Sequence, residues 1–148
     1  MNKRILLIID SLGIGGAERA VTNLSKGFIE KGYHVDLVSI DNDIKILPTD
    51  DKAHLHILGF KNRLFKYFIY EYKLKKLIQK IKQYNNKQFD LILVNLQKST
   101  RLMKNYKKNN NIYHVIRNTL SQSAVKNKSG LKYYLKKKRI QSIYNNLN

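Results

Sequence analysis

The sequence has no cysteine and only one proline in 148 residues. The absence of cysteine excludes disulfide bonds, a thiolate nucleophile and a zinc site built from thiolates. The four histidines, at positions 34, 54, 56 and 114, do not have the His-Glu-x-x-His spacing of a zinc site, so no metal or other cofactor is expected. His54 and His56 alternate on one face of a short extended segment and are predicted to be surface residues.

Long apolar runs are also missing at the N-terminus. The run from Ile5 to Ile9 has five residues before Asp10 interrupts it. The apolar region of an export signal has about 7–15 residues, and a membrane-spanning helix needs about 20. The sequence therefore predicts a cytoplasmic protein, or one held peripherally at the inner face of the cell membrane.

Acidic residues are scarce. The chain has 10 Asp and Glu against 29 Lys and Arg, which gives a net charge of +19. Such a charge attracts polyanions, namely nucleic acid, an anionic membrane surface or phosphorylated substrates. The hydrophobic content of 43% is sufficient for the core of a single domain of this length.

The first 40 residues have the pattern of a β-α-β unit. Residues 5–9 form a continuous apolar run, typical of a strand buried on both faces of a parallel sheet. A glycine-rich turn follows, and then apolar residues recur at helical spacing until Lys31 and Gly32, a basic end with a glycine C-cap. Residues 34–40 alternate as a second strand.

The rest of the chain continues this alternation, which predicts an α/β fold with a doubly wound, mainly parallel Rossmann-like sheet. Further strands are expected at 55–58, 89–94 and 112–116, helices at 63–84, 100–108 and 131–147, and a loop at 121–130.

The helix predicted at 63–84 has two different faces. Lysines follow one face, and an apolar stripe that should pack on the sheet follows another. The stripe comprises Leu64, Tyr67, Phe68, Leu74, Leu77, Ile78 and Ile81.

The glycine-rich turn carries the main chemical signal. Glycines between a buried strand and a helix allow backbone N–H groups to approach a phosphate at the helix N-terminus. Gly13-x-Gly15 supplies two glycines of a dinucleotide-binding turn, but Glu18 occupies the third position, and Asp41 lies further along than the usual ~20 residues for a ribose-binding acid. The spacing alone fits a phosphate-facing turn and a purely structural turn equally well, and nicotinamide binding less well.

The residues from Asp10 to Arg19, Asp-Ser-Leu-Gly-Ile-Gly-Gly-Ala-Glu-Arg, closely resemble the first loop of family 4 glycosyltransferases. Those are retaining enzymes of the GT-B class, in which two Rossmann-like domains face each other across a cleft. Residues 113–119, Tyr-His-Val-Ile-Arg-Asn-Thr, resemble a strand and loop where these enzymes often read His-Asn-Thr, and residues 131–147 resemble the basic helix before their next strand.

The resemblance implies that residues 1–148 are the N-terminal, acceptor-side domain of a GT-B enzyme. Such an enzyme transfers a hexosyl or N-acetylhexosaminyl group from a nucleotide-sugar to a lipid-linked or lipopolysaccharide-type acceptor. The C-terminal domain, with its paired glutamates, is not in the sequence, and nothing acidic follows Asp90, so the chain by itself is expected to be inactive. Its expected partners are that missing domain, the nucleotide-sugar, the acceptor and an anionic membrane surface.

The same resemblance assigns candidate site residues but no catalytic residue. Gly15 and Gly16 are expected to approach the donor diphosphate. Arg19 either supports this loop or the substrate, or is a solvated first-turn arginine. Arg117 stands where many relatives have histidine; an arginine cannot act as a base near neutral pH, but it can hold a phosphate or carboxylate with two hydrogen bonds.

Asn118 and Lys98 complete the expected substrate contacts, although Lys98 also fits a solvated surface residue. Two alternatives to a glycosyltransferase remain, a basic nucleic-acid-binding module and another nucleotide-binding Rossmann domain. Nucleic acid is not expected as a partner, because the sequence has no helix-turn-helix, RNP or zinc signature.

Overall fold

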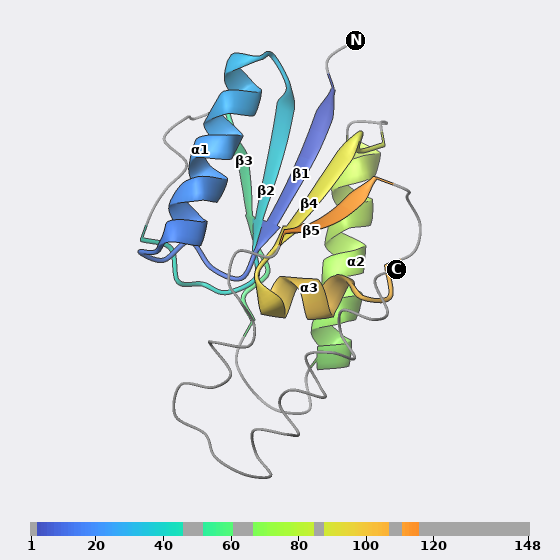
Figure 1. Cartoon of the computed structure of the whole chain (residues 1–148). Coiled ribbons are helices and arrows are strands. Elements are labelled where there is room, and N and C mark those ends of the chain that lie inside the picture. Colours follow the sequence, from blue (N-terminus) through green and yellow to red (C-terminus); the bar gives the residue numbers. More distant parts are fainter. Residues whose placement is uncertain (1–2, 46–51, 61–66, 85–87, 107–110, 116–148) are drawn as a thin grey trace. The chain divides into compact units, whose positions relative to one another are not determined.

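Five parallel strands form one sheet in the order β3-β2-β1-β4-β5 (Figure 1). The computed structural model describes residues 3–45, 52–60, 67–84, 88–106 and 111–115, all within the unit Met1–Val115. The strands are β1 Arg4–Ile9, β2 His34–Ser39, β3 His54–Ile57, β4 Leu91–Asn95 and β5 Ile112–Val115. This is the α/β, Rossmann-like doubly wound architecture that the alternation of strands and helices predicts.

Helices cover both faces of the sheet (Figure 1). Helix α1, Gly16–Glu30, packs on one face, and α2, Tyr67–Tyr84, and α3, Gln97–Met103, pack on the other. All six residues of β1 are buried, because alternate side chains of the central strand enter the two separate cores. The apolar run of residues 5–9 was therefore correctly interpreted.

The predicted end of the first helix is confirmed in detail. Gly32 has a φ of 79°, a left-handed conformation that favours glycine. Its N–H donates to the carbonyl of Ile29 at 2.8 Å, and the N–H of Tyr33 donates to that of Phe28 at 3.0 Å. The rings of Phe28 and Tyr33 lie 5.9 Å apart, so the Schellman motif has its usual hydrophobic contact.

The predicted apolar stripe of α2 is wrong at Phe68. Tyr70, Leu74, Ile78 and Ile81 are buried, whereas Phe68 is 83% exposed. The buried residues recur every three or four positions, whereas Phe68 lies six positions before Leu74, about 120° around the helix from it, and therefore faces outward. The hydroxyl of Tyr70 donates to the carbonyl of Gly59 at 3.3 Å. Residues 61–66, including the predicted start of this helix and Leu64, lie outside the described residues.

The third predicted helix is displaced. It was expected at residues 100–108, but α3 begins at Gln97 and ends at Met103. The carboxylate of Asp10, which follows β1, caps the N-terminus of α3. The residues around α3 give no sign of this contact, because Asp10 is distant in the sequence. The loop predicted at 121–130 and the helix predicted at 131–147 also lie outside the described residues.

A buried ion network was not predicted. Arg4 lies inside β1, and its guanidinium pairs with Asp36 at 2.9 Å; their side chains are 3% and 5% exposed. His56 contacts the other carboxylate oxygen of Asp36 at 3.0 Å. Its assignment to the surface is therefore correct only in part, since its side chain is 28% exposed and faces a buried partner, while His54 is exposed as predicted.

Candidate functional site

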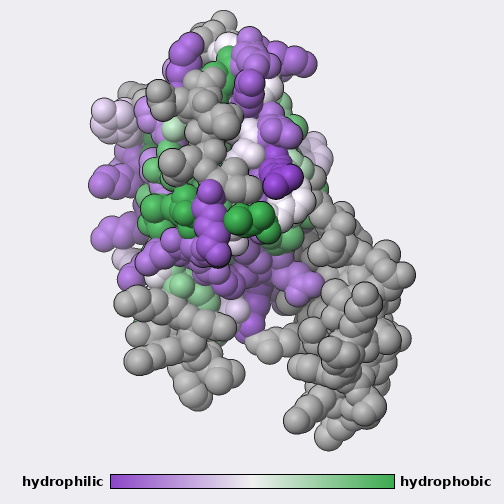
Figure 2. Space-filling model, turned by 90° about the vertical axis from the view of Figure 1, so that its left-hand side faces the viewer, coloured by the Kyte–Doolittle hydropathy of each residue, from purple (hydrophilic) through white to green (hydrophobic). Residues whose placement is uncertain are grey.

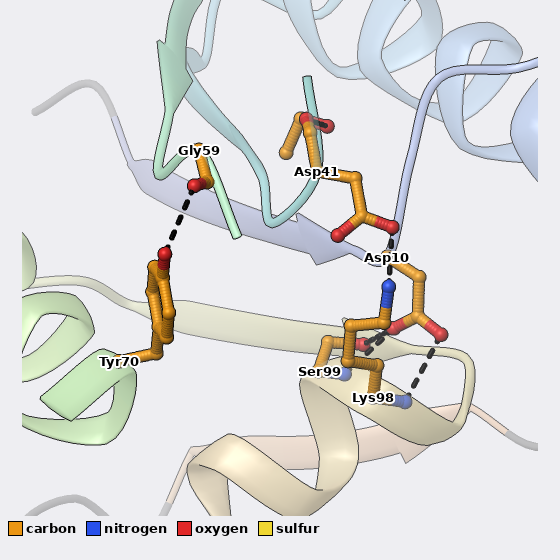
Figure 3. A network of polar contacts seen from close by, with 7 residues as sticks. Asp10, Asp41, Gly59, Tyr70, Lys98 and Ser99 are labelled. Atoms are coloured by element: carbon orange, nitrogen blue, oxygen red, sulfur yellow. Dashed lines mark hydrogen bonds and ion pairs between the residues drawn. The ribbon is translucent and has the colours of Figure 1, made fainter. Parts of the chain in front are cut away.

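The strand order changes direction beside β1. From β1 the chain goes outward to β2 and β3 and then returns to β4 and β5 on the other side. In open α/β sheets, ligands bind outside the carboxyl ends of the strands at such a switch point. Two segments meet there, residues 10–16 after β1 and residues 95–99 at the end of β4 (Figure 3).

The glycine-rich turn is anchored to the segment that follows β2. The N–H of Leu12 donates to the carbonyl of Asp43 at 3.0 Å, and the N–H of Lys45 donates to the carbonyl of Leu12 at 2.8 Å. Gly15 is the N-cap of α1, with an extended backbone at φ −162°, and its carbonyl accepts the N–H of Arg19 at 3.1 Å. The turn therefore connects the central strand β1 to the N-terminus of α1.

The two glycines that precede and begin α1 differ in their surroundings. A Cβ at Gly15 would clash with Oε2 of Glu18, the flexible end of a side chain. A Cβ at Gly16 would meet nothing within 4 Å, and the residue is exposed. Within the described part of the chain, no packing contact requires a glycine at position 16.

Glu18 and Arg19 occupy the first turn of α1. The carboxylate of Glu18 reaches back over Gly15, where it faces the positive end of the helix dipole. Arg19 is exposed, and its side chain forms no hydrogen bond or ion pair with another described residue. The position fits both interpretations of Arg19, a solvated arginine and a ligand contact.

Asp10 caps α3 from a different segment. Its carboxylate accepts the N–H of Lys98 at 3.0 Å, and the N–H and hydroxyl of Ser99 at 2.6 and 2.8 Å (Figure 3). Burial raises the pKa of Asp10 above its ordinary value, although these hydrogen bonds act in the opposite direction. The contact joins the glycine-rich turn to the end of β4.

The backbone at Leu96 is strained. Its φ of 71° and ψ of 174° lie in a region that residues with a side chain rarely adopt, at a cost of about 1–3 kcal/mol. Leu96 is the N-cap of α3, and this conformation points the first N–H groups of the helix at Asp10. Strain of this kind tends to occur at functional sites.

Lys98 is not a solvated surface residue. Its ammonium group forms an ion pair with Oδ2 of Asp41, and their side chains are 23% and 24% exposed (Figure 3). The same nitrogen lies 5.1 Å from the centre of the Phe60 ring, a cation–π contact. Oδ1 of Asp41 is buried, and none of the described residues provides it with a hydrogen bond.

The site is more acidic than the chain as a whole. Of the ten acidic residues in the chain, four lie in or beside the two segments, namely Asp10, Glu18, Asp41 and Asp43. Sequence reasoning overlooked Asp10 and Ser99 and discounted Asp41. Their signal was available: Asp10 and Asp41 each follow a strand closely, and the carboxyl ends of parallel strands share one edge of the sheet.

The structure brings together some of the predicted site residues. Gly15, Gly16 and Arg19 lie together at the start of α1. Lys98 is joined to this segment by the hydrogen bond from its backbone N–H to Asp10, at the end of β1. Arg117 and Asn118 fall outside the described residues, and their roles stay predictions.

His114 is half-buried, with Nδ1 3.4 Å from the hydroxyl of Thr100, and burial lowers its pKa. Among the described residues, no group of three or more His, Asp or Glu side chains is arranged to hold a metal ion. No helix in the same part of the chain is long and apolar enough to cross a bilayer.

A cavity of about 330 Å³ lies elsewhere, between α2 and the starts of β2 and β3. Its walls include Asp36, His56 and Tyr84 and none of the predicted site residues. It therefore lies toward the opposite end of the strands from the switch point, and we do not assign the donor site to it.

Comparison with known proteins identifies no family. No family model matches the chain, and no curated protein matches its sequence. The functional argument therefore rests on the residues at the carboxyl edge of the sheet.

Proposed function

We propose that this chain is the acceptor-side domain of a retaining, nucleotide-sugar-dependent glycosyltransferase, and that the glycine-rich turn contacts the donor diphosphate. The observation that carries the proposal is the position of this turn. It leads from the central strand to the N-terminus of a 15-residue helix at the switch point of the sheet. Backbone N–H groups at such a helix start favour phosphate.

The surroundings of Gly16 support a close ligand approach. No described contact requires a glycine at position 16, and its side-chain position opens on free space. A phosphate that contacts the backbone would need this space. Glu18 lies near the neighbouring Gly15, and its side chain is flexible enough to move when an anion arrives.

The chemistry of sugar transfer fits backbone donors and cations better than a nucleophilic triad. When the bond between the sugar and the diphosphate breaks, negative charge grows on the leaving group and has to be stabilised. The acceptor hydroxyl also has to be held in line with the breaking bond. In this proposal Gly15 and Gly16 contact the diphosphate, Lys98 and Arg19 supply positive charge, and Arg117 with Asn118 anchors a substrate.

The proposed acceptor is lipid-linked, which places the domain at an anionic membrane surface. Helix α2 offers a suitable face, because Phe68, Ile69 and Tyr72 are 83%, 50% and 66% exposed. Lys73 and Lys76 follow on the same helix and are also exposed. Each lysine near an anionic leaflet contributes about 1 kcal/mol, and exposed aromatic side chains suit the interfacial region.

Vesicle sedimentation tests the membrane part. We expect salt-sensitive binding to anionic vesicles and little binding to zwitterionic ones, with weaker binding after the replacement of Phe68 and Tyr72 by serine. Tyr113→Ser is the matched control, since this tyrosine is 58% exposed on β5. Neutralising four basic residues of the helix predicted at 131–147 should also weaken binding; they are Lys136, Lys137, Lys138 and Arg139. Equal binding to both kinds of vesicle at low salt would contradict the membrane proposal.

Competition binding tests the glycosyltransferase proposal. Labelled UDP-sugars should bind the 148-residue chain, with NAD and duplex DNA as competitors that separate the two alternatives. We expect unlabelled UDP to displace the label and NAD to leave it bound. Displacement by NAD at equal concentration, or binding of DNA alone, would contradict the proposal.

A further inference from the structure

Three positive groups at the switch point are already occupied by carboxylates of the chain itself. Asp10 accepts the first N–H groups of α3, Glu18 lies over the start of α1, and Asp41 holds the ammonium group of Lys98. An anionic ligand at this edge therefore meets competitors that are built into the protein. The three differ in how readily they can leave.

Asp10 is the least exchangeable of the three. It accepts three hydrogen bonds, two of them from backbone N–H groups, and it connects the end of β1 to the start of α3. Its removal would leave the start of α3 without a cap. We therefore treat it as a structural link between the two segments.

Asp41 is held more loosely. Among the described residues its carboxylate has one side-chain partner, the ammonium group of Lys98, which contacts Oδ2. Oδ1 is buried, and no described residue gives it a hydrogen bond. A buried acceptor without a donor is unfavourable, so the present position of Asp41 does not satisfy its carboxylate fully.

Lys98 is suited to exchange one anion for another. Lysine carries a flexible point charge with three hydrogen-bond donors, and it can donate to a phosphate as well as to a carboxylate. In the ion-paired position its ammonium group lies 5.1 Å from the centre of the Phe60 ring. The backbone of Lys98 is fixed by Asp10, so only the side chain has to move.

From these contacts we infer that Asp41 is a built-in competitor for Lys98, and that a phosphate-bearing ligand at the switch point takes Lys98 from it. This rests on the proposed function and assigns Asp41 a part in it, as the residue that sets the affinity of the site for diphosphate. Without a ligand the ion pair keeps the cation neutralised. With a ligand the ammonium group contacts the phosphate, and the carboxylate of Asp41 is free to turn toward solvent.

Calorimetric titration of the 148-residue chain with inorganic pyrophosphate and with UDP tests the inference. Asp41→Asn should bind pyrophosphate about tenfold more tightly than the wild type, equivalent to about 1.4 kcal/mol. The gain should vanish when Lys98→Ala is added. Glu30→Gln is the matched control, because it changes the net charge equally at an exposed pair with Lys26 on α1.

Three results would overturn the inference: no gain in Asp41→Asn, an equal gain in Glu30→Gln, or a gain that persists without Lys98. Asp41→Ser is a second variant in case Asp41→Asn does not fold, and the far-ultraviolet circular dichroism of each protein checks this. A Lys98-dependent gain for pyrophosphate, together with no binding of any nucleotide-sugar, would keep this inference and contradict the proposed function.

Discussion

Replacing Gly16 by alanine should change stability and ligand binding in opposite directions. The added Cβ meets nothing within 4 Å, and the backbone at Gly16 is not in the left-handed region. A glycine-to-alanine change at such a position stabilises a protein by about 0.4–1 kcal/mol, because the unfolded chain loses freedom. For a chain of this size the expected rise in Tm is about 1–4 °C.

The effect on binding follows from the space that the methyl group fills. If a diphosphate contacts the backbone at Gly16, the methyl group lies in the contact. Overpacking by one methyl group costs about 1–3 kcal/mol, so the Kd for a UDP-sugar should rise about 5- to 150-fold. Gly16→Val should abolish binding while leaving the fold intact.

Gly27→Ala is the matched control. Gly27 lies in the same helix, and a Cβ there also meets nothing within 4 Å. This variant should raise Tm and leave the Kd unchanged. The measurements are differential scanning calorimetry for Tm and titration of each chain with a UDP-sugar for Kd. If Gly16→Ala binds the UDP-sugar as tightly as Gly27→Ala does, no close phosphate contact exists at Gly16 and the reasoning is refuted.

Three further variants test other parts of the account. Arg4→Met should lower the free energy of unfolding by about 3–5 kcal/mol, because Asp36 stays buried without the guanidinium group that pairs with it. Adding Asp36→Leu should restore most of the lost stability. Urea unfolding that shows no loss of stability in Arg4→Met would contradict this. Folded Asp10 holds its proton to a higher pH than unfolded Asp10, so the wild type should lose stability as pH rises from about 3.8 through the raised pKa, and Asp10→Asn should lack this slope. Urea unfolding at several pH values measures this pH dependence of stability, and parallel profiles for the wild type and Asp10→Asn would contradict the prediction. Arg117→Lys, in an active enzyme that contains this domain, should raise the Michaelis constant for one substrate, because a point charge replaces a planar fork; unchanged kinetics for donor and acceptor would contradict the anchor role.

The central elements of the fold could be predicted from the sequence because their signals are local. A continuous apolar run such as residues 5–9 predicts a strand that is buried on both faces. Gly32 marks the end of α1 because its backbone adopts the left-handed conformation that favours glycine. Helical spacing located α2 and its buried face. Phe68 was placed wrongly because it does not share the spacing of the buried residues Tyr70, Leu74 and Ile78.

The candidate site was only partly predictable, since its polar contacts join distant segments. Lys98 and Asp41 are 57 residues apart in the sequence, and Asp10 and Ser99 are 89 apart. The glycine-rich turn could be recognised from its glycine content and position. To predict the ion pair at Lys98, one has to know which strands are neighbours. The order of the strands provides that knowledge, and a sequence pattern alone does not fix it.

The most direct test of the central claim is to locate a bound donor by NMR. In a ¹⁵N-labelled 148-residue chain titrated with a UDP-sugar, the largest amide shifts should fall on Gly15, Gly16 and Lys98. Amides beside the separate cavity, such as those of His56 and Tyr84, should stay in place. Shifts confined to the cavity, or no shift at the glycine-rich turn under saturating UDP-sugar, would contradict the assignment of this turn to the donor diphosphate.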